Sequence, residues 1–183
     1  MLRERLKELI HELNCIEYGE FELASGGVSD YKIVCDRLFL KFEPKYILGR
    51  LGSDILSDIE ERTGKRYDIV GVVTGGFEFA KLVAEVAERK DDVISVNPHN
   101  GEVKAIPEKE INIKFSNLCY FEDVVTKGGS VLKCRNILEK HDGKDDQAIS
   151  IINRQEGGEE NLEQNGIKLN HILTKNDLEI KNQ

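Results

Sequence analysis

The chain begins with apolar residues at helical spacing. Between residues 2 and 13, apolar positions fall on one side of a helix and charged positions on the other. The apolar positions are Leu2, Leu6, Leu9, Ile10 and Leu13. This pattern predicts an amphipathic helix that ends near Asn14.

The pattern changes after this helix. From residue 16 to residue 40, short apolar or alternating pieces are separated by SGG at 25–27 and SD at 29–30, which favours strands and turns. We interpret this segment as a small hood-like element. Pro44 suits the first turn of a helix, and it opens a longer amphipathic stretch that stops at the Thr-Gly pair at 63–64.

The rest of the chain alternates between apolar runs and amphipathic stretches, which is typical of β-α-β units. Predicted strands lie at 67–73, 93–96, 118–121, 148–152 and 167–173, and predicted helices lie at 77–87 and 130–140. Continuous apolar strands are typical of parallel sheets that are covered on both faces. We therefore predict an α/β fold with a mostly parallel twisted sheet flanked by helices. We expect one domain over residues 1–183, with the N-terminal helix and the hood at 1–40 and the α/β core at 41–175.

Residues 97–116 lack a clear period. This segment contains Pro98, Gly101, Pro107 and several charges. A loop of that length in a compact domain is usually functional or mobile. The alternative is a solvent-exposed hairpin without a chemical role.

Composition and charge exclude several classes of protein. The chain has 183 residues, enough for a substantial core, and a net charge of −8. Its excess acid is spread along the chain, so no basic stripe exists for a nucleic-acid backbone, and we expect no nucleic-acid partner. The charged N-terminus does not resemble a signal peptide, and no apolar run approaches the roughly 20 residues of a membrane span. We expect no membrane partner.

The cysteines do not form a recognisable metal or disulfide motif. They are Cys15, Cys35, Cys119 and Cys134, with no CxxC pair and no histidine at a zinc-ligand spacing. We therefore assign no metal ligands and expect reduced cysteines in a cytoplasmic protein. Cys119 lies in an apolar run, where we expect a small buried side chain and not a nucleophile.

The most informative stretch is residues 118–130. A hydrophobic strand ends in Glu122 and Asp123, and a glycine-containing turn then leads into a helix. Glycines allow consecutive backbone N–H groups to surround an anion, and hydroxyls of Thr126 and Ser130 add donors. The acids precede this turn at the carboxyl end of a strand, where open α/β sheets bind ligands. The stretch therefore predicts a phosphate site beside two carboxylates.

The pattern differs from the nucleotide-hydrolase motif GxxxxGK[ST] and from the dinucleotide motif GxGxxG. Adjacent acids followed by Thr-x-Gly-Gly-Ser suit a phosphorylated ribose, because the acids accept hydrogen bonds from its hydroxyls while the loop binds its phosphate. In a plainer interpretation, the acids end a strand and the glycines form an ordinary turn. The run FEDVVTKGGS at 121–130 resembles the signature of the type I phosphoribosyltransferases.

Three further pieces resemble the orotate phosphoribosyltransferase family, in the correct order. They are FELASGGVSDY at 21–31, GVVTGGFEFA at 71–80 and IINRQEGG at 151–158. Within the family, the first piece helps to enclose the base, the second contacts pyrophosphate, and the third carries an arginine that recognises the orotate ring. The resemblance extends from about Glu20 to Lys175.

This resemblance implies the conversion of orotate and phosphoribosyl pyrophosphate to orotidine monophosphate and pyrophosphate, with Mg²⁺ on the pyrophosphate. Glu122 and Asp123 would stabilise positive charge on the sugar, and the family forms homodimers. The implied contacts to phosphoribosyl pyrophosphate are Thr74, Gly75, Gly76, Glu122, Asp123, Val124, Val125, Thr126, Lys127, Gly128, Gly129 and Ser130. The implied contacts to orotate are Ser25, Gly26, Thr126 and Arg154.

The chain departs from the family after residue 96. Active members have Arg-Lys there, followed by a mobile loop with Lys and His-Gly, whereas this chain has Asn97 and Pro98. Lys104 is our candidate for the catalytic cation, with Lys109 as an alternative. Either His99 or the Asn100-Gly101 turn is a candidate for a shifted remnant of His-Gly. Two other hypotheses stay open, namely a nucleotide-binding regulator with weak or no catalysis, and a phosphoribosyltransferase for another base.

Overall fold

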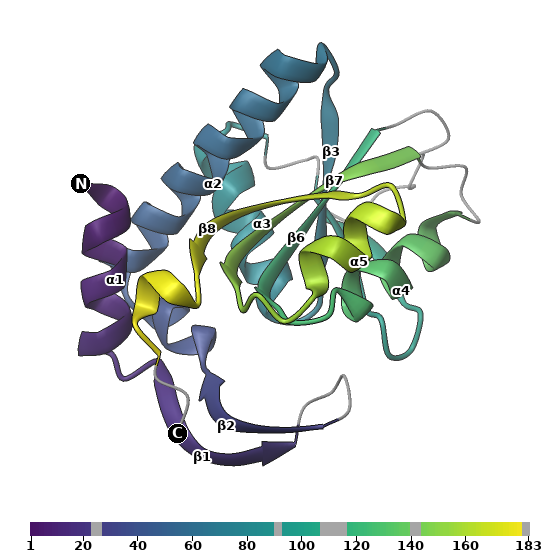
Figure 1. Ribbon diagram of the computed structural model, residues 1–183. Coiled ribbons are helices and arrows are strands. Elements are labelled where there is room, and N and C mark those ends of the chain that lie inside the picture. Colours follow the sequence, from purple (N-terminus) through teal and green to yellow (C-terminus); the bar gives the residue numbers. More distant parts are fainter. Residues whose placement is uncertain (23–26, 90–92, 107–116, 140–143, 181–183) are drawn as a thin grey trace.

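The buried apolar runs of the sequence form the centre of the protein. The computed structural model describes residues 1–22, 27–89, 93–106, 117–139 and 144–180. Within these residues, a six-stranded sheet has the order β5-β4-β3-β6-β7-β8 (Figure 1). Its strands are β3 (Tyr67–Val72), β4 (Val93–Val96), β5 (Val103–Ile106), β6 (Asn117–Val125), β7 (Lys144–Asn153) and β8 (Lys168–Thr174). Neighbouring strands are parallel, except that β5 is antiparallel to β4.

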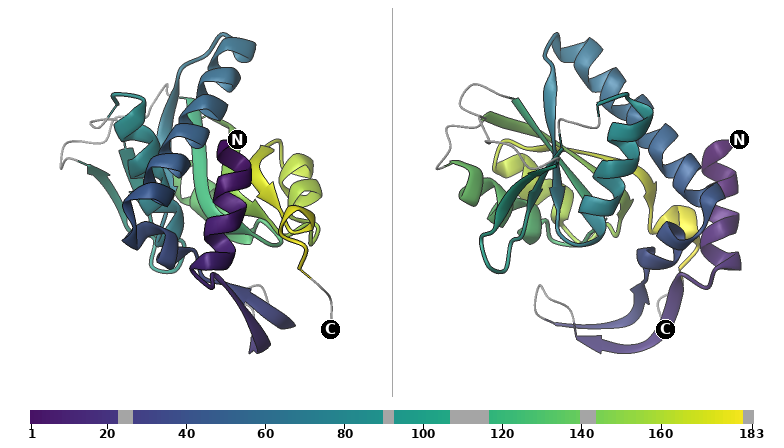
Figure 2. Two further views of the ribbon diagram at one scale, coloured as in Figure 1. Left: turned by 90° about the vertical axis from the view of Figure 1, so that its left-hand side faces the viewer. Right: turned by 180° about the vertical axis from the view of Figure 1, so that it is seen from behind.

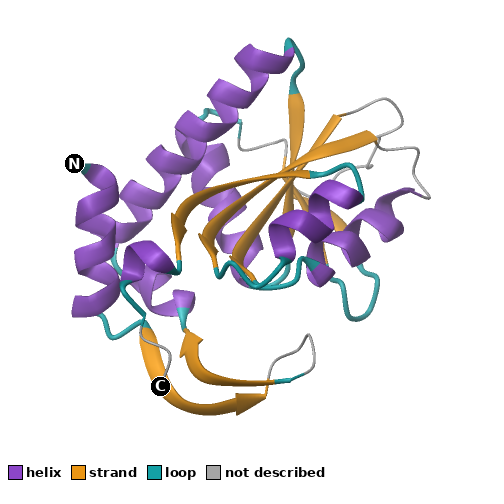
Figure 3. Ribbon diagram, viewed as in Figure 1, coloured by secondary structure: helices purple, strands orange, loops and turns teal. Residues whose placement is uncertain are grey.

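Helices cover both faces of this sheet (Figures 2 and 3). One side has α1 (Leu2–Glu12), α2 (Phe42–Thr63) and α3 (Gly75–Val86), and the other has α4 (Gly129–Leu138) and α5 (Gly158–Gln164). Consecutive residues of a strand point to opposite faces. Phe121 accordingly belongs to the apolar cluster with Leu6 and Phe79, whereas Tyr120 belongs to the cluster with Val131 and Leu162.

A two-stranded hairpin forms the hood. Strands β1 (Ile16–Glu22) and β2 (Val28–Ile33) are antiparallel, and the short 3-10 helix η1 (Cys35–Leu40) leads from them into α2. The hairpin extends away from the sheet, below the edge where β6, β7 and β8 end (Figure 1). This placement leaves the loops at the carboxyl ends of the parallel strands facing the hood.

The predicted fold class is confirmed, and most predicted elements are present. The first helix, the hood strands, the long helix ending at Gly64 and the β-α-β alternation all agree with the sequence pattern. Three segments differ from the prediction. Residues 97–116 are not one loop, because β5 occupies 103–106, residues 35–40 are a 3-10 helix, and α5 was not predicted. Residues 107–116 lie outside the described residues.

The cysteines are buried, as expected for Cys119. All four thiols are free, and Cys119 is 0% exposed within the apolar core. Burial raises the pKa of Cys15 to about 11 and the pKa of Cys134 to about 12. These thiols therefore stay protonated near neutral pH. Among the described residues, no helix combines the length and the apolar character that a membrane crossing requires.

We expect Gly52→Ala to destabilise the contact between α2 and α3. A methyl group at Gly52 would lie 2.4 Å from Cγ2 of Val83 and 2.8 Å from the ring of Phe79. Overpacking of this kind costs about 1–3 kcal/mol. Thermal unfolding should show a Tm lower by about 2–4 °C per kcal/mol, while Ser57→Ala on the exposed face of α2 should leave the Tm unchanged. An equal Tm for both variants would contradict this packing.

Candidate functional site

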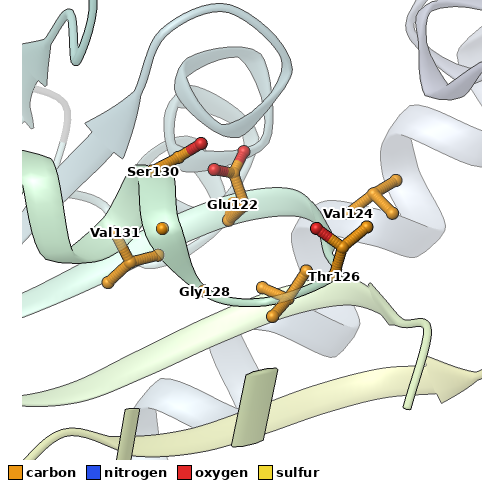
Figure 4. Close-up of a pocket in the computed structure, with 8 residues that line it drawn as sticks. Glu122, Val124, Thr126, Gly128, Ser130 and Val131 are labelled. Carbon is orange, nitrogen blue, oxygen red and sulfur yellow. The ribbon is translucent and has the colours of Figure 1, made fainter. Parts of the chain in front are cut away.

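The turn between β6 and α4 presents a series of unused backbone donors. Gly128 has a left-handed φ of 74°, which favours glycine, and α4 begins at the next residue. Among the described groups, none accepts a hydrogen bond from the backbone N–H groups of residues 127–130. Residues 128–130 line a small hollow with Glu122 and Val131 (Figure 4). Such a turn at a helix N-terminus is suited to bind a phosphate.

The two acids lie inside β6 and point to opposite sides of it. The strand continues to Val125, so the sequence analysis placed its end too early. Glu122 lines the hollow of the turn, on the same side as the Ser130 hydroxyl in Figure 4. Asp123 faces the turn after β3, where a methyl group on Gly75 would lie 2.2 Å from its Oδ2 atom. Each acid therefore faces one of the two loops that are predicted to bind phosphoribosyl pyrophosphate.

Glu122 differs from Asp123 in its electrostatic environment. Its side chain is 8% exposed, and burial, with the charge of Asp123 as the second cause, raises its pKa well above the usual glutamate value. Its Oε1 atom accepts a hydrogen bond from the Asp123 backbone N–H at 3.1 Å, which partly opposes this rise. Asp123 is half-buried, so it is more accessible to solvent than Glu122.

Helix α5 supports the phosphate turn from behind. The side-chain amide of Asn161 donates to the carbonyl of Lys127 at 2.7 Å. A methyl group on Gly158 would lie 2.4 Å from the carbonyl oxygen of Thr126, and one on Gly128 would lie 2.8 Å from Cγ of Leu162. These close approaches leave the turn little freedom to change shape.

A larger cleft of about 490 Å³ lies in front of the turn, a volume within the range of small-molecule sites. It is lined by Lys32, Ile33, Pro98, His99, Val124, Thr126, Lys127, Gly129, Ser130, Lys133, Arg154 and Asn161. Four of these side chains are lysine or arginine and none is acidic, although the whole chain has a net charge of −8. The cleft is therefore suited to an anionic ligand.

The structure places some of the other predicted residues in this cleft and others outside it. Arg154 lines it and is 3% exposed. Thr74 is exposed at the turn after β3. Lys104 is not among the residues that line the cleft; it lies on β5, where its Nζ atom is 2.8 Å from Oε1 of Glu102. Ser25 and Gly26 lie outside the described residues.

The turn at 97–102 joins β4 to β5 and brings one imidazole to the cleft. The side-chain oxygen of Asn97 accepts a hydrogen bond from the His99 backbone N–H at 2.9 Å, and the Asn97 carbonyl accepts one from Gly101 at 2.9 Å. The side of the turn with Pro98 and His99 lines the cleft. Strands β4 and β5 therefore form a hairpin whose turn borders the cleft.

Sequence reasoning missed three polar residues of the cleft, namely Lys32, Lys133 and Asn161. Lys133 could have been found, because it follows Ser130 by three positions and so lies on the same face of α4. Lys32 alternates with the buried Tyr31 and Ile33 along β2, which gives it the opposite face. Asn161 had no signal, because α5 is short and polar.

Comparisons with solved structures define the class of the fold. The orotate phosphoribosyltransferase of Aeropyrum pernix superimposes with a TM-score of 0.75 at 25% identity, covering 95% of this chain and 97% of that one. The Mycobacterium tuberculosis enzyme in complex with phosphoribosyl pyrophosphate gives 0.77 at 22% identity, covering 98% and 100%. The chain has the fold of the type I phosphoribosyltransferases.

Sequence comparisons define the family. An orotate phosphoribosyltransferase of Methanocaldococcus jannaschii is 30% identical over 177 residues, covering 97% of this chain and 97% of that protein. Another, from Pyrococcus abyssi, is 29% identical over 178 residues, covering 97% and 95%. No family model matches the chain. On this full-length similarity, the chain belongs to the orotate phosphoribosyltransferase family.

We expect Glu122→Gln to stabilise the protein increasingly as the pH rises. The folded-state pKa of Glu122 is raised, so this acid is neutral in the folded and the unfolded chain at low pH. Above its ordinary pKa the unfolded chain releases the proton more readily than the folded chain does, which lowers the free energy of unfolding of the wild type. Glutamine does not ionise, so the variant avoids this loss. The Tm difference from the wild type should therefore grow between about pH 5 and pH 8, whereas Glu61→Gln on the exposed surface should give a constant difference. A pH-independent difference for Glu122→Gln would exclude this environment.

Proposed function

We propose that the protein transfers the phosphoribosyl group of phosphoribosyl pyrophosphate to orotate, giving orotidine monophosphate and pyrophosphate in pyrimidine biosynthesis. One observation carries this proposal: the backbone N–H groups of residues 128–130, which donate to no described group, line a hollow with Glu122, and this hollow shares Gly129 and Ser130 with a cleft lined by cations. Such a site fits a phosphorylated sugar and an anionic base. The full-length relatives that bear this enzyme's name support the choice of reaction.

In the proposed reaction, the protein acts through fixed charges near the reacting atoms more than through covalent bonds of its own to the substrate. The bond between C1 of the ribose and pyrophosphate breaks with its electron pair leaving on pyrophosphate, and a ring nitrogen of orotate loses its proton and bonds to C1. Positive charge develops on the sugar in the transition state. Asp123, supported by Glu122, supplies negative charge there, and the backbone of residues 126–130 fixes the sugar through its phosphate.

The turn after β3 is proposed to bind the pyrophosphate. Thr74 lies in this turn, Gly75 and Gly76 begin α3 directly after it, and Gly75 abuts Asp123. His99 and Lys133 approach the same cleft from the hairpin and from α4. Lys104 stays a candidate for a further catalytic cation, although its ammonium group pairs with Glu102.

The donor set also fits Mg²⁺ bound together with the substrate. Among the described residues, no cluster of three or more acidic, histidine or cysteine side chains forms a metal cage. Magnesium sites of phosphate enzymes commonly use one or two carboxylates together with substrate oxygens. Asp123, which faces the turn proposed for pyrophosphate, would serve as such a carboxylate, and the ion would neutralise charge on the departing pyrophosphate.

The base is proposed to bind near Arg154 and Thr126, and Ser25 and Gly26 are proposed as further contacts to it. A guanidinium donates paired hydrogen bonds to a carboxylate or an imide edge, both of which orotate presents. Arg154 and Thr126 both line the cleft, and this supports the assignment.

A homodimer in the cytoplasm completes the proposal. The free, buried cysteines are consistent with a reducing compartment. Leu40, Phe42 and Tyr46 are 79%, 85% and 56% exposed at the start of α2, and clustered exposed apolar side chains are typical of interaction surfaces. Sedimentation equilibrium should therefore give twice the chain mass, and a monomer mass at micromolar concentration would contradict the dimer.

We expect turnover with orotate and a large loss of it in Asp123→Asn. Pyrophosphate release should occur with phosphoribosyl pyrophosphate, Mg²⁺ and orotate, but not with adenine, guanine, hypoxanthine or uracil. Asp123→Asn removes a negative charge that stabilises the transition state, so it should lower kcat by at least about tenfold. Asp58→Asn, on the exposed face of α2, should leave kcat unchanged. Tight binding of nucleotide without turnover would favour a regulatory protein, and unchanged kinetics in Asp123→Asn would remove this acid from the reaction.

A further inference from the structure

Arg154 is held between the core and the hood. Its backbone N–H donates to the carbonyl of Val125 at 2.9 Å, which ties the segment after β7 to the end of β6. Its Nη2 atom donates to the hydroxyl of Ser29 in β2 at 2.8 Å. Its Cζ atom lies 4.0 Å from the ring centroid of Tyr31, so the guanidinium stacks on a hood residue.

One oxygen of Glu156 connects these groups. Oε1 of Glu156 accepts a hydrogen bond from Nε of Arg154 at 2.9 Å and lies 2.8 Å from its Nη2 atom. The same oxygen accepts a hydrogen bond from the Tyr31 hydroxyl at 3.4 Å. Gln155 has a left-handed φ of 56°, and its N–H donates to the side chain of Asn153 at 2.9 Å. The turn that these residues form brings Arg154 and Glu156 together.

These contacts engage the Nε and Nη2 atoms on one edge of the Arg154 guanidinium, whereas the edge with Nη1 makes none of them. Nε and Nη2 are engaged by Glu156 and Ser29. Within the part of the chain that the structure describes, no group accepts a hydrogen bond from Nη1, and Arg154 lines the cleft. The guanidinium is planar, so fixing one edge also fixes the direction of the remaining N–H donors.

We propose that Glu156 is a positioning residue that orients Arg154 for the base and couples base recognition to the hood. The inference rests on the proposed function, since the base is taken to be orotate. Glu156 acts through Arg154 and Tyr31, which it holds in one arrangement before the ligand arrives. Preorganisation of this kind raises affinity because less conformational freedom is lost on binding.

The test compares two ligands that share a phosphate and differ in the base. Orotidine monophosphate carries both groups, whereas ribose 5-phosphate has only the sugar phosphate. In Glu156→Ala, calorimetry should show the Kd of orotidine monophosphate raised by about tenfold or more, with the Kd of ribose 5-phosphate within about twofold of the wild type. Glu160→Ala removes the same charge from an exposed position of α5 and should change neither Kd.

Two further variants keep the test interpretable. Glu156→Gln keeps an oxygen that accepts from Arg154 and should show a smaller loss than Glu156→Ala, and it serves as the readout if the alanine variant does not fold. Tyr31→Phe keeps the stacked ring but removes the hydroxyl that bonds to Glu156, so it should weaken orotidine monophosphate selectively if the hood is coupled to the base.

The outcomes separate this inference from the proposed reaction. An unchanged Kd of orotidine monophosphate in folded Glu156 variants would overturn the inference, as would an equal loss for both ligands. A wild type that binds orotidine monophosphate no better than ribose 5-phosphate would overturn it as well. A wild type that prefers orotidine monophosphate but shows no turnover would contradict only the reaction, and the selective loss in Glu156→Ala would still support the positioning role.

Discussion

The close approach of the turn after β3 to strand β6 is the constraint on which the site depends. A methyl group at Gly75 would lie 2.2 Å from a carboxylate oxygen of Asp123, and one at Gly76 would lie 2.2 Å from the carbonyl of Phe121. Only hydrogen atoms fit there, so the two β-α-β units meet with their loops in contact. The proposed pyrophosphate turn and the proposed phosphate turn are thereby held on either side of the same two acids.

The two acids of β6 illustrate how neighbouring residues acquire different properties. Both carry a carboxyl group, but strand alternation sends Glu122 toward α4 and Asp123 toward the turn after β3. Burial then favours the neutral form of Glu122. The phosphate turn, in contrast, works through backbone N–H groups, and its function is therefore less sensitive to the side chain at Lys127.

Local patterns were sufficient to predict much of the fold and the phosphate turn. The alternation of apolar runs and amphipathic stretches marks β3, α3, β6 and α4, and the acids and glycines of residues 122–130 lie in one continuous segment. The remaining features depend on contacts that a sequence does not display. Helix α5 has only seven residues, GEENLEQ, with one apolar side chain, so it has no recognisable period. Strand β5 has four residues and, among the described strands, pairs only with β4.

Contacts between distant segments were also beyond the sequence. Arg154 could be singled out by its motif, but its hydrogen bond to Ser29 joins residues 125 positions apart. Lys32 and Lys133 reach the cleft from the hood and from α4, and neither belongs to a motif. Their role follows from the way in which the hood faces the ends of the parallel strands.

The contrast between an acidic molecule and a cation-lined cleft has a consequence for how a ligand arrives. At long range an anion meets the field of the net charge of −8, which repels it, and only near the mouth do the cleft cations dominate. Salt shortens the reach of both fields to about 10 Å at 0.1 M. Modest ionic strength therefore removes the distant repulsion before it removes the local attraction, so capture of a polyanion should be fastest at an intermediate salt concentration.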